Sequence, residues 1–230
     1  MTRIGITMYW EANPPERAVT HGEWKFTLNR SYCRLFDGLD AVPSGLLPVQ
    51  GMPPRDAVSG LHGLVMTGGD DPSPELYGRE NRGSRTIEIH RPLWEMELYR
   101  EARAAKIPIL AVCLGMQLAA VAEGTPLIQD IASSVPGALD HENGPHRVHL
   151  VSGSTVHRLL GERPMVSSVH HQALESLPPG YRETGRSSDG ILEAMESKDG
   201  LVIAVQWHPE RDGTGSVMIR EFVRMAREGL

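Results

Sequence analysis

Cysteine and long hydrophobic runs are scarce in this sequence. Only Cys33 and Cys113 occur among 230 residues, too few for the disulfide framework that staples small secreted domains. No apolar segment approaches the roughly 18 to 20 residues that a membrane-spanning helix needs. These two absences favour a cytoplasmic protein with reduced thiols, and they argue against a membrane partner.

An excess of positive charge is missing as well. Lys and Arg number 23 against 29 Asp and Glu, a net charge of −6, and no long block carries one sign. We therefore expect neither nucleic acid nor an anionic membrane surface as a partner. Residues 1–7 begin with strand-like alternation instead of a charged start and a long apolar block, so we expect no signal peptide.

A familiar metal-binding spacing is also absent. His141, His146 and His149 lie close together and His170 adjoins His171, but these intervals match no common zinc motif, and cysteine or carboxylate partners are not evident from the spacing. We expect no metal and no cofactor. Polar loop histidines are usually solvated or hydrogen-bonded, and we expect His170 and His171 to shape a substrate pocket.

The most informative stretch is residues 107–122. An apolar run of strand length ends in Cys113, a small-residue turn follows, and the pattern then lengthens into a helix. The first N–H groups of a helix have no intrahelical partner, and their partial positive charge stabilises a thiolate and a neighbouring oxyanion. Cys113 is therefore a candidate nucleophile. The local pattern leaves an alternative open, a small buried residue at the end of a core strand.

Strands alternate with helices in the first half of the chain. Apolar runs and helical spacings predict strands at 4–8, 46–49, 61–67 and 107–112, with helices at 26–36 and 92–106. Strand, crossover helix and strand in that order imply a parallel sheet with right-handed connections. Active sites in such sheets lie at the carboxyl ends of the strands, where Gly69 and Cys113 would meet. An N–H of this glycine loop could form half of an oxyanion hole, although a plain turn has the same composition.

The second half contributes more strands than helices. Short apolar runs between turn residues predict strands at 128–131, 147–151, 165–169, 191–195 and 201–206, followed by a helix within 213–230. Residues 11–23, which carry two adjacent prolines and several charges, predict a surface loop that could serve as a lid. No internal repeat and no low-complexity linker divides the chain, so we expect one domain spanning residues 1–230.

A candidate base follows the last predicted strand. His208 lies in the segment Gln-Trp-His-Pro-Glu at 206–210. A cysteine nucleophile needs an imidazole within about 4 Å and a third group that fixes the tautomer of the ring. Glu210 has the right chemistry for that third group, although His-Pro-Glu after a strand also suits a simple turn.

In combination, these motifs resemble the class I glutamine amidotransferase superfamily. The elbow Cys-Leu-Gly-Met-Gln, the glycine loop and the Gln-Trp-His-Pro-Glu segment carry the resemblance, which extends from residue 4 to residue 210. Within the superfamily, the segments 68–77, 127–131 and 167–172 are most similar to the gamma-glutamyl-gamma-aminobutyrate hydrolase family. The resemblance implies an α/β fold with three layers. Helices would flank a mostly parallel, flavodoxin-like central sheet, accompanied by a smaller antiparallel sheet.

The resemblance also implies a catalytic triad and an oxyanion hole. Cys113 would be the nucleophile, His208 the general base and acid, and Glu210 the residue that orients His208. The backbone N–H groups of Gly69 and Leu114 would bind the oxyanion.

Substrate-binding residues follow from the same resemblance. Gln117 and the backbone around His171 and Gln172 would hold the α-amino and α-carboxylate groups of a glutamyl moiety.

The chain departs from the hydrolase family at several positions, which are Leu114 for Arg, Ala120 for Asn, Thr125-Pro126 for Gly-Thr, and Pro92 for Asp after Arg91. None of these departures alters the triad, but they leave the leaving group open.

The sequence therefore leads to a main hypothesis and two alternatives. The main hypothesis is a thiol hydrolase of small γ-glutamyl amides, with a γ-glutamylated amine or peptide as substrate. The second is a glutaminase or amide-transferring enzyme that serves a biosynthetic partner enzyme. The third is a non-catalytic binding module on the same fold. The sequence leaves the oligomeric state open, a homodimer included.

Overall fold

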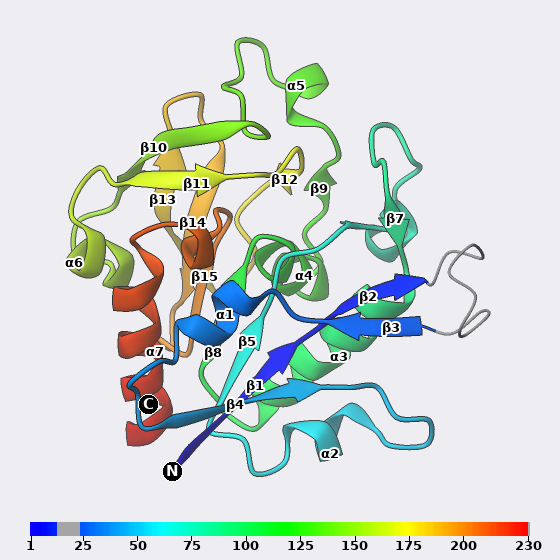
Figure 1. Cartoon of the computed structure of the whole chain (residues 1–230). Helices are drawn as coiled ribbons and strands as arrows, with labels where there is room; N and C mark the ends of the chain where they lie inside the picture. Colours follow the sequence, from blue (N-terminus) through cyan, green and yellow to red (C-terminus); the bar gives the residue numbers. More distant parts are fainter. Residues whose placement is uncertain (13–23, 230) are drawn as a thin grey trace.

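The structure, a computed structural model, describes residues 1–12 and 24–229. Its centre is one nine-stranded mixed sheet (Figure 1). From edge to edge the strands are β11 (Met165–Ser168), β10 (Gly144–Leu150), β13 (Tyr181–Ser187), β14 (Leu192–Ser197), β15 (Val202–Val205), β8 (Ile109–Val112), β5 (Gly63–Met66), β1 (Thr2–Thr7) and β4 (Ala41–Leu46). The strands from β15 to β4 run parallel, and those from β14 to β11 are antiparallel. The expected α/β architecture is confirmed, with the antiparallel strands continuing the parallel core in the same sheet.

The register of the parallel core aligns three strand ends. Met66 of β5 pairs with Ala111 of β8, and Val112 of β8 pairs with Val205 of β15. The chain segments that leave these strands therefore emerge side by side at one edge of the sheet. This edge receives both the glycine loop and Cys113, as the strand order predicted.

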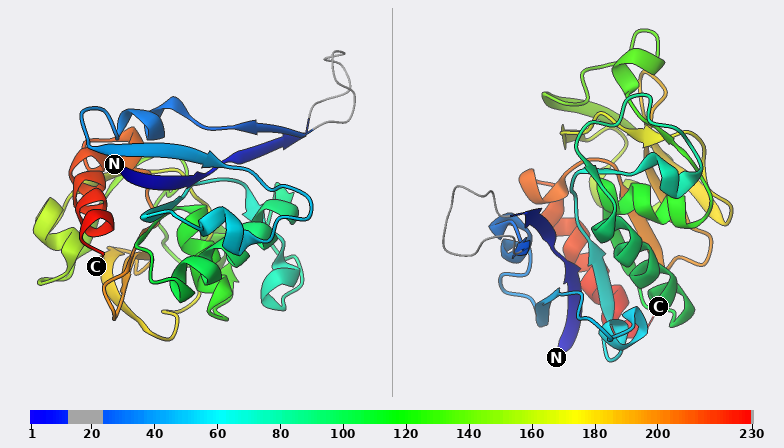
Figure 2. Two further views of the ribbon diagram at one scale, coloured as in Figure 1. Left: turned by 90° about the horizontal axis from the view of Figure 1, so that it is seen from below. Right: turned by 90° about the vertical axis from the view of Figure 1, so that its right-hand side faces the viewer.

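Helices cover both faces of the sheet because the central strands are apolar on both sides. Leu64 and Met66 of β5 pack into a core with α3 (His90–Ala104) and α4 (Leu114–Ala122). Val65, which points the other way, packs into a second core with α7 (Gly215–Glu228). The shorter helices α1 (Arg30–Arg34) and α6 (Thr155–Leu160) contribute to this second core. Figure 2 shows the helices from two further sides.

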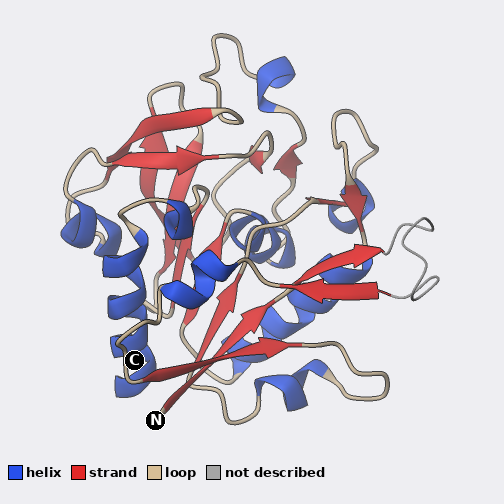
Figure 3. Cartoon of the chain, viewed as in Figure 1, coloured by secondary structure: helices blue, strands red, loops and turns tan. Residues whose placement is uncertain are grey.

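Short elements complete the chain and lie mostly around the sheet (Figure 3). They are the pairs β2 (Tyr9–Ala12) with β3 (Trp24–Thr27), β6 (Asp71–Pro72) with β7 (Ile87–Glu88) and β9 (Leu127–Ile128) with β12 (Ala173–Leu174), together with α2 (Pro54–Val58), η1 (Pro74–Tyr77), α5 (Ile131–Ser134) and η2 (Pro209–Arg211). No helix in the described ranges is long and apolar enough to span a membrane.

The N-terminal third differs from two expectations. The helix expected at 26–36 is confined to α1, because Phe26 belongs to β3. The Asn29 side chain accepts a hydrogen bond from the Ser31 N–H, 3.1 Å away, and so caps the helix start. The strand expected at 46–49 ends at Leu46 instead and begins at Ala41. This strand contains Pro43, which an edge strand tolerates and which disguised it in the sequence.

The rest of the chain differs from expectation at one predicted strand and at one strand that was not predicted. The strand expected at 128–131 ends at Ile128, and the Asp130 side chain accepts from the Ser133 N–H and caps α5. The polar strand β13 was not expected, because its sequence lacks an apolar run. The surface loop and lid expected at 11–23 lies, for residues 13–23, outside the described residues, while residues 11 and 12 belong to β2.

Gly115 permits the close approach of α4 to β5. A Cβ atom at Gly115 would lie 2.6 Å from the backbone oxygen of Met66, and a backbone atom cannot swing aside. We expect Gly115→Ala to lower the free energy of unfolding by about 1 to 3 kcal/mol, the usual cost of overpacking a core. Urea denaturation measures this difference. Gly213→Ala is the matched control, because nothing lies within 4 Å of a Cβ built there. Equal stability of the two variants would contradict the proposed steric constraint.

Candidate active site

Cys113 occupies a strained elbow between β8 and α4. Its backbone angles are φ 51° and ψ −106°, a region that costs a non-glycine residue about 1 to 3 kcal/mol. The Cys113 N–H donates to the Val205 carbonyl at 2.8 Å, and the Cys113 carbonyl accepts from the Gln117 N–H at 3.2 Å. Strand pairing and the first helical turn thus hold the strained residue from both sides. This sharp strand-to-helix turn has the geometry of a nucleophile elbow.

His208 and Glu210 lie beside the thiol, at the end of β15. His208 Nδ1 lies 2.7 Å from Glu210 Oε1, so the carboxylate fixes the ring and leaves Nε2 as the nitrogen for Cys113. The Cys113 side chain is close enough to raise the pKa of His208. Both His208 and Glu210 are buried. The His208 N–H also donates to the Ser167 carbonyl at 2.9 Å, which anchors the histidine to β11.

The charge balance of this group favours a protonated His208. Burial lowers the pKa of the imidazole, but the Cys113 and Glu210 side chains outweigh burial and raise this pKa to about 10. The Gln206 amide also donates to the Cys113 sulfur, at 3.6 Å. The arrangement therefore favours a protonated imidazole beside the Cys113 thiol at neutral pH.

Gly68 and Gly69 bring the backbone after β5 against the thiol and the imidazole. A Cβ atom at Gly68 would lie 2.7 Å from His208 Cε1 and 3.6 Å from Cys113 Cβ. One at Gly69 would collide with the Arg91 guanidinium and lie 2.8 Å from Leu114 Cδ2. At both positions a side chain would be too close to a neighbouring residue, so the backbone needs glycine there. The Leu114 side chain, 1% exposed, packs behind Gly69.

Side chains from distant elements fix this glycine loop. The Gly68 N–H donates to the Tyr32 hydroxyl at 3.1 Å. Arg91 Nη2 donates to Thr67 Oγ1 at 2.9 Å, while Arg91 Nε donates to Glu95 Oε1 at 2.5 Å. Since the Arg91 and Glu95 side chains are 2% and 0% exposed, the loop rests on a fully buried ion pair.

A cavity of about 500 Å³ opens beside the glycine loop. Its volume falls in the range of pockets that hold small ligands. Polar and aromatic groups dominate its wall, which consists of Tyr9, Thr27, Leu28, Asn29, Tyr32, Thr67, Gly68, Gly69, Asp70, Val169, His208, Glu210 and Arg211. Two of the predicted triad residues and one predicted oxyanion residue therefore face the same cavity.

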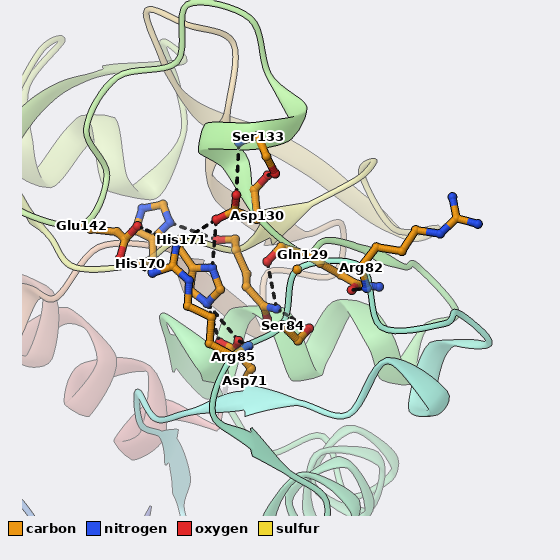
Figure 4. A network of polar contacts seen from close by, with 12 residues as sticks. Asp71, Arg82, Ser84, Arg85, Gln129, Asp130, Ser133, Glu142, His170 and His171 are labelled. Atoms are coloured by element: carbon orange, nitrogen blue, oxygen red, sulfur yellow. Dashed lines mark hydrogen bonds and ion pairs between the residues drawn. The ribbon is translucent and has the colours of Figure 1, made fainter.

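The predicted substrate-binding residues lie within a polar network. Gln117 donates from Nε2 to the Gln172 carbonyl at 3.2 Å. His171 is held between two carboxylates, with Nε2 2.8 Å from Asp71 Oδ2 and Nδ1 3.3 Å from Asp130 Oδ1 (Figure 4). Gln117, His171 and Gln172 are not among the described residues that line the cavity. Their role in binding a glutamyl group stays a prediction.

Several contributors to the site were missed by the sequence reasoning. Tyr32, Arg91 and Gln206 reach the glycine loop or the thiol through contacts between elements distant in sequence. Arg91 was noted only as part of a departure from the family pattern. Gln206, two residues before His208, offered the one local signal, because a polar residue ends an otherwise apolar strand.

The Glu210 carboxylate is expected to control the protonation of His208. Glu210→Gln removes one of the groups that stabilise the imidazolium, so we expect the pKa of His208 to fall from about 10 toward its ordinary value of about 6.5. Histidine NMR titration measures this shift, with the distant Glu221→Gln as control. Because the folded pKa exceeds the unfolded one, the associated stabilisation is complete below about pH 6.5 and is lost as the pH rises toward 10. An unchanged pKa in Glu210→Gln would contradict the assigned contact.

The buried Arg91–Glu95 pair yields a stability prediction. Arg91→Met leaves the Glu95 carboxylate without its partner, so we expect a loss of about 3 to 5 kcal/mol in the free energy of unfolding, largely recovered by adding Glu95→Leu. Chemical denaturation tests the double-mutant cycle. The Arg224–Glu221 pair, whose arginine is exposed, supplies the control, since Arg224→Met is expected to cost less than about 1 kcal/mol. Full additivity of the two core substitutions would refute the coupling.

Similarity to known proteins identifies the family. Residues 3–210 match the Peptidase C26 family. The chain is 37% identical over 186 residues to the protein NtpR of Enterococcus hirae, covering 76% of each chain. It is 32% identical over 165 residues to the gamma-glutamyl-gamma-aminobutyrate hydrolase PuuD of Escherichia coli strain K12, covering 65% of this chain and 64% of PuuD.

The fold is also that of solved amidotransferase structures. A glutamine amidotransferase from Thermotoga maritima superposes with a TM-score of 0.64 at 17% identity, over 99% of this chain and 84% of its own. Because the family match spans residues 3–210, most of the chain, the chain belongs to the Peptidase C26 family of glutamine amidotransferase-like hydrolases.

Proposed function

We propose that the protein hydrolyses the γ-glutamyl amide bond of a small γ-glutamyl compound, through a triad of Cys113, His208 and Glu210. The observation that carries this proposal is the strained elbow of Cys113, which sets the thiol beside an imidazole already oriented by a buried carboxylate. A thiol, a base and an orienting carboxylate are the parts that acyl transfer through a covalent intermediate requires.

The reaction begins with attack on the side-chain carbonyl of the γ-glutamyl group. The Cys113 thiolate bonds to that carbon, and the backbone N–H groups of Gly69 and Leu114 bind the oxyanion that forms. Leu114 is the first residue of α4, so its N–H has no intrahelical acceptor. The Tyr32 hydroxyl and Arg91 hold the adjacent loop, which supports a preorganised oxyanion site.

Collapse of the oxyanion breaks the carbon–nitrogen bond. The His208 imidazolium gives its proton to the departing amine, and a γ-glutamyl thioester on Cys113 remains. The neutral imidazole then takes a proton from water, which attacks the thioester and releases glutamate. The thiolate and imidazolium are restored at the end of the cycle. The Glu210 carboxylate stabilises the imidazolium in both halves of the reaction.

The cavity wall supports a small polar leaving group. Asp70 and Arg211 line the cavity beside His208, and the Tyr9 hydroxyl donates to the Asp70 carboxylate. Leu114, which replaces the Arg usual in the hydrolase family, is 1% exposed and packs behind Gly69. The Leu114 side chain therefore lies behind the cavity wall and not in it, and the selection of the leaving amine is assigned to residues such as Asp70 and Arg211.

A screen of γ-glutamyl compounds tests the proposed activity. We expect the purified protein alone to release glutamate from γ-glutamylated amines or peptides, detected by mass spectrometry, and Cys113→Ala to lose activity by a factor of at least about 10⁴. Cys33→Ala is the matched control, because the Cys33 side chain is exposed and distant in sequence. Turnover that survives in Cys113→Ala would refute the thiol mechanism.

Free glutamine belongs in the same screen. Hydrolysis of glutamine that rises sharply on addition of a partner synthase would favour the glutaminase alternative. A thiol that fails to react with a glutamine-like electrophile at neutral pH would favour a non-catalytic binding module. Accumulation of a γ-glutamyl adduct on Cys113 after rapid acid quench, and its absence from Cys33, would support the thioester intermediate.

A further inference from the structure

A second cluster of titratable side chains lies outside the catalytic cavity. It consists of His141, His146 on β10, His170 after β11, and Glu193 on β14, which are 3%, 8%, 6% and 0% exposed. We refer to these four residues as the histidine cluster. Glu193 is its centre, because Glu193 Oε1 lies 3.2 Å from His141 Nδ1, 3.0 Å from His146 Nε2 and 3.7 Å from His170 Nε2.

Hydrogen bonds on the outer side fix the tautomers of two of these histidines. His141 Nε2 lies 2.8 Å from Asp189 Oδ2, and His170 Nδ1 lies 3.0 Å from the Gln172 carbonyl oxygen. Both outer partners are acceptors, so the outer nitrogen of each ring must carry the proton. In the neutral rings, His141 Nδ1 and His170 Nε2 are therefore lone pairs.

These lone pairs face the Glu193 side chain, whose ionised carboxylate has only acceptor oxygens to offer them. Within the described part of the chain, His141 Nδ1, His170 Nε2 and Glu193 Oε2 are buried without a hydrogen-bond partner. Buried acceptors that face one another without a donor are costly, and a cation between them removes that cost.

The geometry fits a metal ion. The candidate ligand atoms of His141, His170 and Glu193 all lie within 4.8 Å of one another. Tetrahedral Zn²⁺ with bonds of about 2.0 to 2.1 Å separates its ligand atoms by roughly 3.3 Å, close to the 3.2 Å and 3.7 Å between Glu193 Oε1 and the two ring nitrogens. The outer contacts to Asp189 and to the Gln172 carbonyl are those that orient metal-bound histidines.

We propose that His141 Nδ1, His170 Nε2 and the Glu193 carboxylate bind one divalent transition-metal ion, of which Zn²⁺ suits two imidazoles and a carboxylate best. His146 Nε2 donates to Glu193 and orients the carboxylate. A cavity of about 250 Å³, lined by His141 and His170 among others, offers an entry path and room for a water as the fourth ligand. The spacing of the histidines in the sequence did not reveal this site, because the carboxylate partners Glu193 and Asp189 come from the β13–β14 hairpin, which follows later in the chain.

The ion would connect this cluster to the segment beside the catalytic helix. The Gln172 carbonyl accepts from His170 Nδ1 and from Gln117 Nε2 of α4. A metal that holds His170 therefore also holds the turn at 170–172 against α4. Its role is structural, a clamp between β14, the loop that contains His141, and this turn.

Protons compete with a metal ion for the ring nitrogens of the histidine cluster. Burial lowers the pKa of His141, but Glu193 and Asp189 outweigh burial and raise it. A cluster neutralised by imidazolium ions would need no metal. The experiment must therefore measure metal binding directly.

Zn²⁺ titration of the Cys113→Ala protein is the test. The Cys113 substitution is needed because a thiolate beside an imidazole is itself a zinc-binding pair. After removal of bound metal with a chelator, calorimetry with ZnCl₂ is expected to give one Zn²⁺ per chain, and the midpoint of thermal unfolding is expected to rise with Zn²⁺ concentration. Added His170→Gln should weaken binding on the order of 100-fold, and Asp189→Asn, which spares the ligands, by about 10- to 100-fold.

His149→Gln is the matched control, since His149 lies on the same strand as His146 with its side chain exposed. It should bind Zn²⁺ like the Cys113→Ala parent, and circular dichroism should show that each variant is folded. Failure of the parent to bind Zn²⁺ would overturn the proposal and leave protons as the occupants. Binding that persists unchanged in both His170→Gln and Asp189→Asn would overturn it as well, because the ion would then lie elsewhere.

Discussion

The alignment of three parallel strand ends is the constraint on which the candidate site depends. β5, β8 and β15 are neighbours in register, so the segments that follow them must emerge together. Each segment contributes one chemical part, which is a glycine loop, a thiol or an imidazole. The register of the sheet sets the distances between these three segments. This explains how Cys113 and His208, almost a hundred positions apart, can form one site.

Buried charge is used sparingly but at decisive places. The Arg91–Glu95 pair lies behind the glycine loop, Glu210 lies behind His208, and Glu193 lies at the centre of three histidines. Charged groups leave water only at a high cost, which partners must offset. Each buried carboxylate here faces a cationic or protonatable group, and each such pair holds a segment next to the candidate active site or the histidine cluster. The buried carboxylates are thus found where a segment of backbone has to be held in one position.

Much of the parallel core could be predicted from the sequence, because its strands are fully buried and read as continuous apolar runs. The elbow at Cys113, the helix α3 and the strand before His208 followed from such patterns. β13 could not be recognised, since Arg182, Glu183 and Arg186 give it a polar sequence. Its pairing with β14 is a tertiary effect that overrides local propensity.

The candidate site was predictable where its residues adjoin recognisable strand ends. It was unpredictable where residues from elements distant in sequence come together. Cys113, His208 and Gly69 belong to the first kind. Tyr32 and Arg91 belong to the second, because their contacts to the loop at 67–69 join elements 24 or more residues apart. Glu193 likewise looks like an ordinary strand residue until the fold brings to it His146 of β10, His141 of the preceding loop and His170 of the turn after β11. Spacing rules describe ligands on one element, and these ligands come from separate ones.

The proline in β4 has a consequence for how this sheet meets other chains. β4 is an edge strand, and an edge strand normally offers a row of backbone donors and acceptors to any extended peptide. Pro43 has no N–H and interrupts that row. Another copy of the chain that added a strand at this edge would meet a gap in the ladder. The parallel half of the sheet is therefore a weaker template for growth by strand addition.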